Sequence, residues 1–203
     1  MRDDADDAAL FRAWAAGEKR AGAALIDRHY DSVERFFDTK VADRAEDLAQ
    51  LTFLRCAEAA PTWRGDGGFR AFLFGVARNV LREHIRGRVR DGARPMDFDT
   101  ASIADLVPGA ATLASRNAEH LQLARALQRL PLDLQELVEL YYWEELPIEE
   151  LAACMGVPPG TIKSRLHRAR GLLKEAMDAL PDGEAGLEGA RTLLRRWVER
   201  VRG

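Results

Sequence analysis

The sequence predicts an all-α protein of two small helical domains, joined by a flexible linker and followed by a C-terminal helix. Apolar residues recur at spacings of three and four, which is the period of an amphipathic helix. Ala, Leu, Arg and Glu dominate and favour helices, and no segment alternates as a half-buried strand does. With 203 residues, 47% of them hydrophobic, the chain is long enough to bury two cores.

The first domain, residues 1–91, is predicted to hold four helices. Glycines interrupt the early apolar pattern, and Pro61 ends a later one because proline breaks a helix interior. Residues 62–68 then form a loop. In order, the helices are an early pair interrupted near Gly17 and Gly22, a third at about 43–60 and a fourth at about 69–90.

The helical pattern breaks at residues 92–118, where glycine, proline, serine and threonine are scattered. This composition is typical of a flexible linker rather than of a packed element. Helical patterns return after it and define a second domain at 119–177. A C-terminal extension, residues 178–203, includes an arginine-rich helical segment at about 186–202.

Residues 147–175 predict a helix-turn-helix. Gly156 lies at the turn, where a left-handed backbone or a close helix approach favours glycine. Pro158 and Pro159 suit the entry to the next helix, because proline is tolerated in a first helical turn. One face of that second helix carries Ile162, Leu166, Ala169 and Leu173.

The opposite face of this second helix carries small and basic residues. Small residues allow close approach to a DNA major groove, and basic residues contact phosphates. A helical hairpin with a solvated charged face has a similar pattern, so this segment alone leaves both interpretations open. The candidate DNA contacts are Thr161, Lys163, Ser164, Arg165, His167 and Arg168.

Charge is strongly segregated, although the formal net charge is only −3. Residues 78–94 hold six arginines against two acids, and residues 160–175 hold five Lys or Arg against one acid. Between them, residues 132–155 hold seven acids and no Lys or Arg. Two basic helices with an acidic surface between them suggest a protein that grips an extended polyanion at two points. Ordinary segregation along amphipathic helices is the alternative.

Aromatic and basic residues are interleaved at 63–90, where Arg64 and Arg78 accompany several rings. Single-strand binders use this combination, because rings stack on bases while cations neutralise the backbone. The alternative is that the rings are core, which the helical spacing favours for Phe69 and its neighbours. Trp63 precedes the helix, beside a glycine-rich loop, and is a better candidate for contact with DNA.

Four segments occur together in this chain: RHYDSVERFF, AEDLAQLTFLR, FRAFLFGVARNVL and LPLDLQELVELYYWEELPIEELAACMGVPPGTIKSRLHRARGLL. In these segments the chain resembles bacterial sigma factors of the extracytoplasmic-function (ECF) group. The resemblance covers about residues 8–90, the family's region 2 helical bundle, and 119–176, its region 4 helix-turn-helix domain. Several motifs in the family's order are far more specific than one helix-turn-helix.

The resemblance implies that the chain binds core RNA polymerase and promoter DNA. In the family, region 2 melts the minus-ten element and region 4 reads the minus-thirty-five element in the major groove. The segment from Trp63 to Phe69 corresponds to the loop that captures a flipped base. Arg165 is assigned to a phosphate contact. By motif position and helical face, the residues expected to bind polymerase are Asp47, Gln50, Leu51 and Leu54. The residues expected to bind the minus-ten element are Arg78, Asn79 and Arg82.

The chain departs from the family pattern in two places. Leu51 stands where the family usually has an acid, which adds apolar area to the expected polymerase surface. The extension after Met177 goes beyond minimal members of the family. It is interpreted as a helix packed on region 4; a regulatory cover for a binding surface is the alternative, ahead of a membrane-surface role.

No catalytic, cofactor or metal site is expected. The histidines have no Cys or acid partners at metal-ligand spacing, and no phosphate loop or dinucleotide fingerprint occurs. The two cysteines, an acidic start and the lack of a long apolar run favour a cytoplasmic protein without membrane insertion. An anti-sigma protein is a further partner that the resemblance implies. The alternatives are a stand-alone helix-turn-helix regulator and a degenerate sigma-like interaction module.

Overall fold

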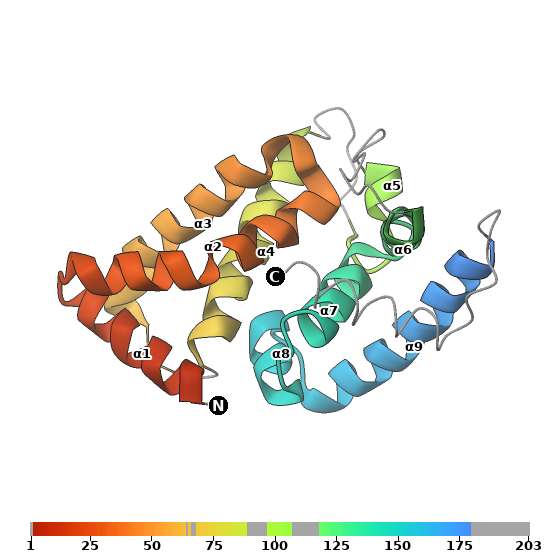
Figure 1. Cartoon of the computed structure of the whole chain (residues 1–203). Helices are drawn as coiled ribbons and strands as arrows, with labels where there is room; N and C mark the ends of the chain where they lie inside the picture. Colours follow the sequence, from red (N-terminus) through yellow and green to blue (C-terminus); the bar gives the residue numbers. More distant parts are fainter. Residues whose placement is uncertain (1, 64, 66–67, 89–96, 107–117, 180–203) are drawn as a thin grey trace.

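The computed structural model describes residues 2–63, 65, 68–88, 97–106 and 118–179, and this part of the chain is helical without a strand. The all-α prediction is confirmed. Helices α1–α4 form one group and α6–α9 a second group beside it (Figure 1). The helices are α1 (Arg2–Ala15), α2 (Lys19–Val41), α3 (Ala45–Ala59), α4 (Phe69–Arg88), α5 (Ile103–Leu106), α6 (Ala118–Leu127), α7 (Leu132–Tyr142), α8 (Ile148–Met155) and α9 (Pro159–Asp178).

The two early glycines have different roles. Gly17 has a φ of +98° and lies in the turn that ends α1, a conformation that favours glycine. Gly22 lies inside α2, and a Cβ there would come within 2.6 Å of the indole of Trp14. The expected interruption at Gly22 is therefore a packing site within a continuous helix, where the missing side chain makes room for a ring.

Helices α1–α4 enclose a core rich in aromatic rings. Phe11 of α1 and Phe69 of α4 are fully buried, with ring centroids 4.9 Å apart. Phe37 of α2 and Phe74 of α4 are also fully buried. The spacing of three and four residues places these rings on the inner faces of their helices.

An ionic contact fixes α1 on α2. The Asp7 side chain is fully buried, and its carboxylate lies 2.7 Å from His29 Nε2 and accepts a hydrogen bond from Arg28. Burial alone would raise the pKa of Asp7, but His29 and Arg28 outweigh it and lower this pKa below its ordinary value. The ionised carboxylate therefore stabilises the fold.

Helix α7 lies between two hydrophobic cores. Leu134 and Val138 pack with α6 and α9 in a core that includes Trp143. Leu137 and Leu140 belong to the other core, which continues into α1–α4. A helix that is apolar on opposite sides must pack against other elements on both sides. Helices α6 and α9 pack against one side of α7, and the core shared with α1–α4 packs against the other.

Part of the predicted linker is packed. In residues 97–106, Phe98 and Ile103 are buried, and the guanidinium carbons of Arg82 and Arg86 lie 5.3 Å from the Phe98 ring centroid. The amide of Leu132 donates to the carbonyl of Ala101 at 3.0 Å. This segment therefore connects α4 to α7 by contacts as well as by the chain.

The predicted helix-turn-helix consists of α8 and α9. Gly156 has φ +67° and ψ +32°, and its amide donates to the carbonyls of the preceding turn, so it caps α8 in the left-handed conformation. Pro159 begins α9. The four apolar positions predicted for the inner face of α9 are buried: Ile162, Leu166, Ala169 and Leu173.

Replacing Asp7 by asparagine is expected to lower the free energy of unfolding by about 1–3 kcal/mol at neutral pH, because it removes a buried charged acceptor. The pKa of Asp7 is lowered on folding, so its contribution is present above the ordinary value of 3.8 and is lost as the pH falls through the lowered value. Denaturant unfolding at pH 7 and in acid measures the difference. Asp6→Asn is the matched control, because Asp6 pairs with Arg28 at the surface and should change stability by no more than about 0.5 kcal/mol. Equal effects of the two variants would contradict the prediction.

Replacing Gly156 by alanine is expected to cost about 1–2 kcal/mol, because a Cβ strains the left-handed backbone while meeting no atom within 4 Å. Gly171→Ala in the middle of α9 is the control, since a Cβ there also meets nothing. That change should stabilise the protein by about 0.5–1 kcal/mol through helix propensity. Thermal unfolding of both variants should show shifts of opposite sign.

Candidate functional site

Helix α9 presents the predicted DNA-reading face to solvent. Lys163, Ser164, His167 and Arg168 are exposed, and Thr161 is half-buried at the start of the helix. Among the residues that the structure describes, neither Lys163 nor Arg168 is in an ion pair. Two cations on an open helix face are available for a polyanion.

Arg165 differs from its exposed neighbours. Its guanidinium lies 2.9 Å from Asp99 Oδ1 and 3.3 Å from Asp133 Oδ2. A phosphate was the expected partner of Arg165, but in this conformation its guanidinium pairs with the carboxylates of Asp99 and Asp133. The helical pattern could not reveal this, because Asp99 and Asp133 come from distant parts of the sequence.

The two arginines predicted to meet minus-ten DNA lie in an interface. Arg78 is 7% exposed, with its Nε 2.9 Å from Glu136 Oε2 and its Nη1 2.9 Å from the carbonyl oxygen of Cys154. Arg82 lies 2.8 Å from the same Glu136 oxygen and also donates to Asp133. The sequence analysis assigned these two arginines to minus-ten DNA. In this conformation residues of α7 and the carbonyl group of Cys154 in α8 occupy them, which helical spacing could not reveal.

The electrostatics of this interface favour charged side chains. Burial alone would lower the pKa of Arg78, but Glu136 and Asp133 raise it above its ordinary value. Burial would raise the pKa of Asp133, yet Arg82 and Arg78 lower it. Both shifts favour the ionised forms of Arg78 and Asp133, whose charged groups lie 3.5 Å apart.

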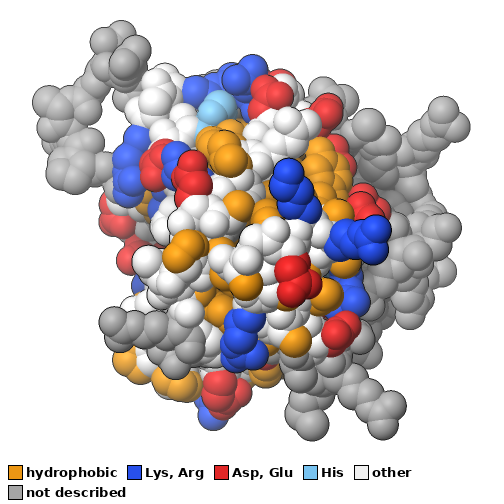
Figure 2. Space-filling view, turned by 90° about the vertical axis from the view of Figure 1, so that its left-hand side faces the viewer, with side chains coloured by type: hydrophobic (Ala, Val, Ile, Leu, Met, Phe, Trp, Pro, Cys, Tyr) orange, Lys and Arg blue, Asp and Glu red, His pale blue; other side chains and the backbone are white. Residues whose placement is uncertain are grey.

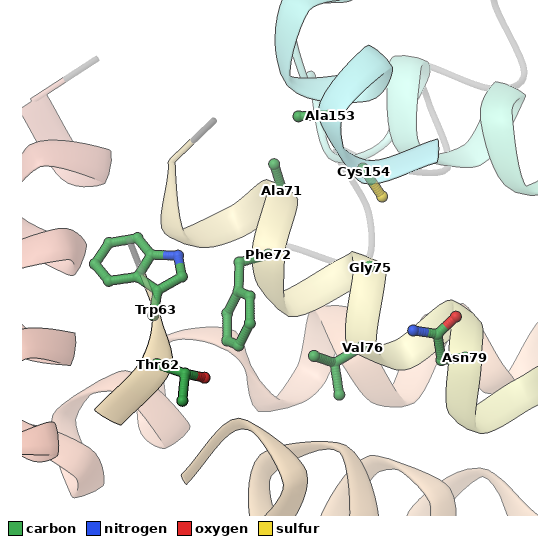
Figure 3. Close-up of a pocket in the computed structure, with 9 residues that line it drawn as sticks. All are labelled: Thr62, Trp63, Ala71, Phe72, Gly75, Val76, Asn79, Ala153 and Cys154. Atoms are coloured by element: carbon green, nitrogen blue, oxygen red, sulfur yellow. The ribbon is translucent and has the colours of Figure 1, made fainter. Parts of the chain in front are cut away.

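A pocket of about 420 Å³ lies between α4, α8 and the segment before α4 (Figure 3). Trp63, Phe72 and the exposed Asn79 line it on one side, and Cys154 lines it on the other. The Trp63 ring packs edge-on against Phe11, with centroids 5.1 Å apart, and its buried Nε1 has no hydrogen-bond partner among the residues that the structure describes. Trp63 is thus both a core contact and a pocket wall.

Phe69 and Arg64 are the remaining region 2 candidates. Phe69 is fully buried between the rings of Phe11 in α1 and His29 in α2, so its assignment as a DNA contact does not agree with the structure. Its helical spacing predicted this core position. Arg64 lies outside the described residues.

Helix α3 presents the predicted polymerase face. Asp47, Gln50 and Leu54 are exposed and Leu51 is half-buried. Leu54 is 56% exposed and is the one large hydrophobic side chain classed as exposed in the described part of the chain. It borders an apolar groove of about 270 Å³ between α1, α2 and α3, which Tyr30 also lines. Viewed from the side where α1–α3 lie in Figure 1, the surface shows separate apolar patches among mixed charges (Figure 2).

An acidic surface next to this groove was missed by the sequence analysis. Burial raises the pKa of Glu34, and so do the neighbouring carboxylates of Asp31, Glu46 and Asp38. The spacing of Asp31, Glu34 and Asp38 on one helix face was the available signal. Together with Leu54, these residues make a surface that suits an apolar and basic partner.

The described ranges contain no group of three or more His, Cys, Asp or Glu side chains that could hold a metal ion. Cys56 is fully buried, and burial raises the pKa of its thiol to about 12. None of the described helices has the length and apolarity needed to cross a membrane.

Comparison with known proteins identifies both halves of the chain. Residues 25–91 match the family model for sigma-70 region 2, and residues 120–173 match the model for sigma-70 region 4. The RNA polymerase sigma-H factor of Pseudomonas aeruginosa is 31% identical over 176 residues, covering 81% of this chain and 90% of that protein. The ECF RNA polymerase sigma-E factor of Escherichia coli is 29% identical over 189 residues, covering 88% and 95%.

Two solved structures share the fold. CnrH, in complex with the cytosolic domain of CnrY, aligns with a TM-score of 0.60 at 22% identity, covering 85% of this chain and 97% of that one. The sigma factor RpoE of Bartonella quintana, in complex with the anti-sigma factor NepR, aligns with a TM-score of 0.58 at 24% identity, covering 77% and 96%.

The matches include region 2 as well as the helix-turn-helix, so a stand-alone helix-turn-helix regulator is not favoured. Sigma factors are non-enzymatic subunits, and the resemblance seen in the sequence is confirmed. The chain belongs to the sigma-70 family, in its ECF group, and is an RNA polymerase sigma factor that directs promoter-specific transcription.

Proposed function

We propose a division of work among the surfaces of this sigma factor: α9 reads the minus-thirty-five element, α3 binds core polymerase, and α4 with Trp63 meets the minus-ten element. The observation that carries the proposal is the face of α9. Its apolar side is buried against α6–α8, while Lys163, Ser164 and Arg168 point to solvent. A helix held in this way can enter a major groove without rearranging its own domain.

The polymerase-binding role of α3 is supported by chemistry of two kinds. The groove beside Leu54 offers apolar surface that water covers in the free chain. The carboxylates around Glu34 and the exposed Asp47 offer negative charge next to it. Interfaces combine an apolar centre with a polar rim, and this surface has both parts.

The minus-ten role of region 2 is supported by a pocket and by its cations. Asn79 and Trp63 line a space of about 420 Å³, which is large enough for a nucleobase. A base that leaves the duplex costs a few kcal/mol, so a ring such as Trp63 would compensate by stacking. Arg78 and Arg82 would contact the backbone after release from their carboxylate partners.

We further infer that the chain works in the cytoplasm as a binding subunit without catalysis of its own, and that an anti-sigma protein regulates it. Two proteins that share its fold were solved with a partner: CnrH with the cytosolic domain of CnrY, and RpoE with the anti-sigma factor NepR. Such a partner would act by covering one of the three surfaces above.

Reconstitution tests the proposal directly. The purified chain is combined with core polymerase, and run-off transcripts are measured on a promoter library. Promoter-specific transcripts are expected. Core binding without any transcript would instead indicate a degenerate sigma-like module, and duplex binding without core polymerase would indicate an independent regulator.

Arg168→Ala is expected to reduce discrimination at the minus-thirty-five element, because a bidentate contact to a base contributes about 1–3 kcal/mol. The measurement is the ranking of promoter variants by run-off transcription. Lys174→Ala is the control, since Lys174 is exposed in the last part of the same helix and pairs with Asp178. An unchanged ranking with Arg168→Ala would rule out base reading by this side chain.

Leu54→Ala is expected to weaken binding to core polymerase about fivefold, which corresponds to about 1 kcal/mol of lost apolar burial. Leu54→Met should keep the affinity, because methionine preserves apolar area of similar size. Titration of labelled chain with core polymerase measures both. Neither change should alter the free energy of unfolding, because Leu54 is 56% exposed in the free chain. Equal affinity of the alanine and methionine variants would place the docking surface elsewhere.

A further inference from the structure

Helix α1 precedes the part of the chain that matches the family model for region 2, because that match begins at residue 25. It nevertheless packs on the segment before α4, which carries Trp63. Phe11 of α1 is fully buried, and its ring centroid lies 5.1 Å from that of Trp63. Helix α1 therefore supports a wall of the pocket proposed for minus-ten DNA.

Arg12, the residue after Phe11, contacts the same segment from the surface. Its guanidinium carbon lies 5.6 Å from the centroid of the Trp63 ring, which is within the range of a cation–π contact. A Cβ at Gly65 would lie 3.5 Å from Arg12 Nη2, so the guanidinium also reaches the backbone at Gly65. Arg12 therefore borders the segment before α4 at two points.

The place of Arg12 is fixed by the packing of its helix. Phe11 lies against Phe69, with ring centroids 4.9 Å apart, and Trp14 occupies the space that the missing side chain of Gly22 leaves. Arg12 lies between these two contacts, in the last turn of α1. Because the helix and the Trp63 ring already restrict this cation, less conformational freedom is lost when it binds an anion.

Arg12 differs from the arginines of α4 in its partners. Arg70, Arg78 and Arg82 each pair with a carboxylate. Arg12 is exposed, and it takes part in no ion pair within the part of the chain whose side chains are described. Its guanidinium is therefore available to an anion beside the pocket.

A guanidinium can bind a ring and a phosphate at the same time. Its flat face packs on an aromatic ring, while its N–H groups lie in its plane and donate to phosphate oxygens. Proteins that bind single strands combine the two contacts, because a base stacks on a ring and its phosphate needs a cation nearby. At this pocket Trp63 supplies the ring and Arg12 supplies the cation.

We propose that Arg12 is a further DNA-binding residue of the minus-ten site, which binds the phosphate of the nucleotide whose base lies against Trp63. The proposal adds α1 to the promoter-binding surface of region 2. Since the ring and the cation hold the same nucleotide, the phosphate contact fixes where the strand enters the pocket. This role of Arg12 rests on the proposed assignment of the Trp63 pocket to the minus-ten element.

The first experiment measures promoter opening by the holoenzyme, on a promoter selected from the run-off library. Permanganate reactivity of unpaired thymines is followed from about 50 to about 200 mM salt. Arg12→Ala should lower the population of open complexes about fivefold, because a charge-assisted contact is lost. The slope of log K against log salt should also become shallower by about 0.7, the value for one phosphate of a single strand. Affinity for core polymerase should not change.

Arg20→Ala is the matched control, since Arg20 is exposed in α2 and does not line the pocket. It removes the same charge and should leave opening and the salt slope unchanged. Arg12→Lys keeps a cation near the phosphate, so it should restore the slope and most of the open complexes. Unchanged opening by Arg12→Ala would overturn the proposal. Reduced opening with the wild-type slope would do so too, because Arg12 would then act only through the position of Trp63.

The second experiment locates the phosphate. Methylphosphonate linkages, which are neutral, replace the phosphates of the minus-ten element one at a time on each strand. At the contacted position, the neutral linkage should lower opening by the wild-type holoenzyme about fivefold and should have no further effect on Arg12→Ala, because both changes remove the same contact. A scan in which no linkage depends on Arg12 would overturn the proposal.

Trp63→Ala separates failure of the proposed function from failure of this inference. If the pocket captures a base, Trp63→Ala should lower opening about tenfold, while Trp63→Phe keeps a stacking ring and should retain most of it. Normal opening by Trp63→Ala would remove the assignment of the pocket to minus-ten DNA, and the proposal with it. Defective opening by Trp63→Ala together with wild-type behaviour of Arg12→Ala would remove only the role of Arg12.

Discussion

The burial of α7 is the constraint on which the rest of the structure depends. Leu134 and Val138 face one core, and Leu137 and Leu140 face the other, so residues 134–140 are all buried. Region 4 therefore cannot leave region 2 without exposing apolar surface. Separation of the two regions would need a new cover for this side of α7, because exposed apolar surface costs free energy in water.

Local periodicity predicted the features that depend on one helix at a time. The apolar face of α9, its exposed Lys163 and Arg168, and the glycine turn at Gly156 follow from spacing and backbone conformation alone. The environment of these residues is set within one small domain, so the sequence was sufficient to predict which of them are buried and which are exposed. Leu54 was also found by its helix face, although the acidic surface around Glu34 beside it was not.

Tertiary pairing explains the features that sequence could not supply. Charged residues are usually exposed, so the acids of residues 132–155 were interpreted as surface. Glu136 and Glu139 are buried instead because Arg78, Arg82 and Lys40, which lie 54 to 99 residues away in the chain, neutralise them. The spacing of acids along one helix contains no information about such distant partners. The same reason applies to Arg165, whose partners come from α7 and from the segment before α5.

The choice of charge rather than apolar surface at this interface has a physical rationale. A buried arginine remains cationic, and a buried cation is tolerated only with a counter-charge beside it. The carboxylates of α7 meet this need, although the desolvation cost and the Coulomb gain of a buried pair nearly cancel. An apolar cover over Arg78 would leave the guanidinium without a partner and would destabilise this arrangement of the two regions. The arginines of α4 are therefore better covered by an acidic helix such as α7 than by an apolar one.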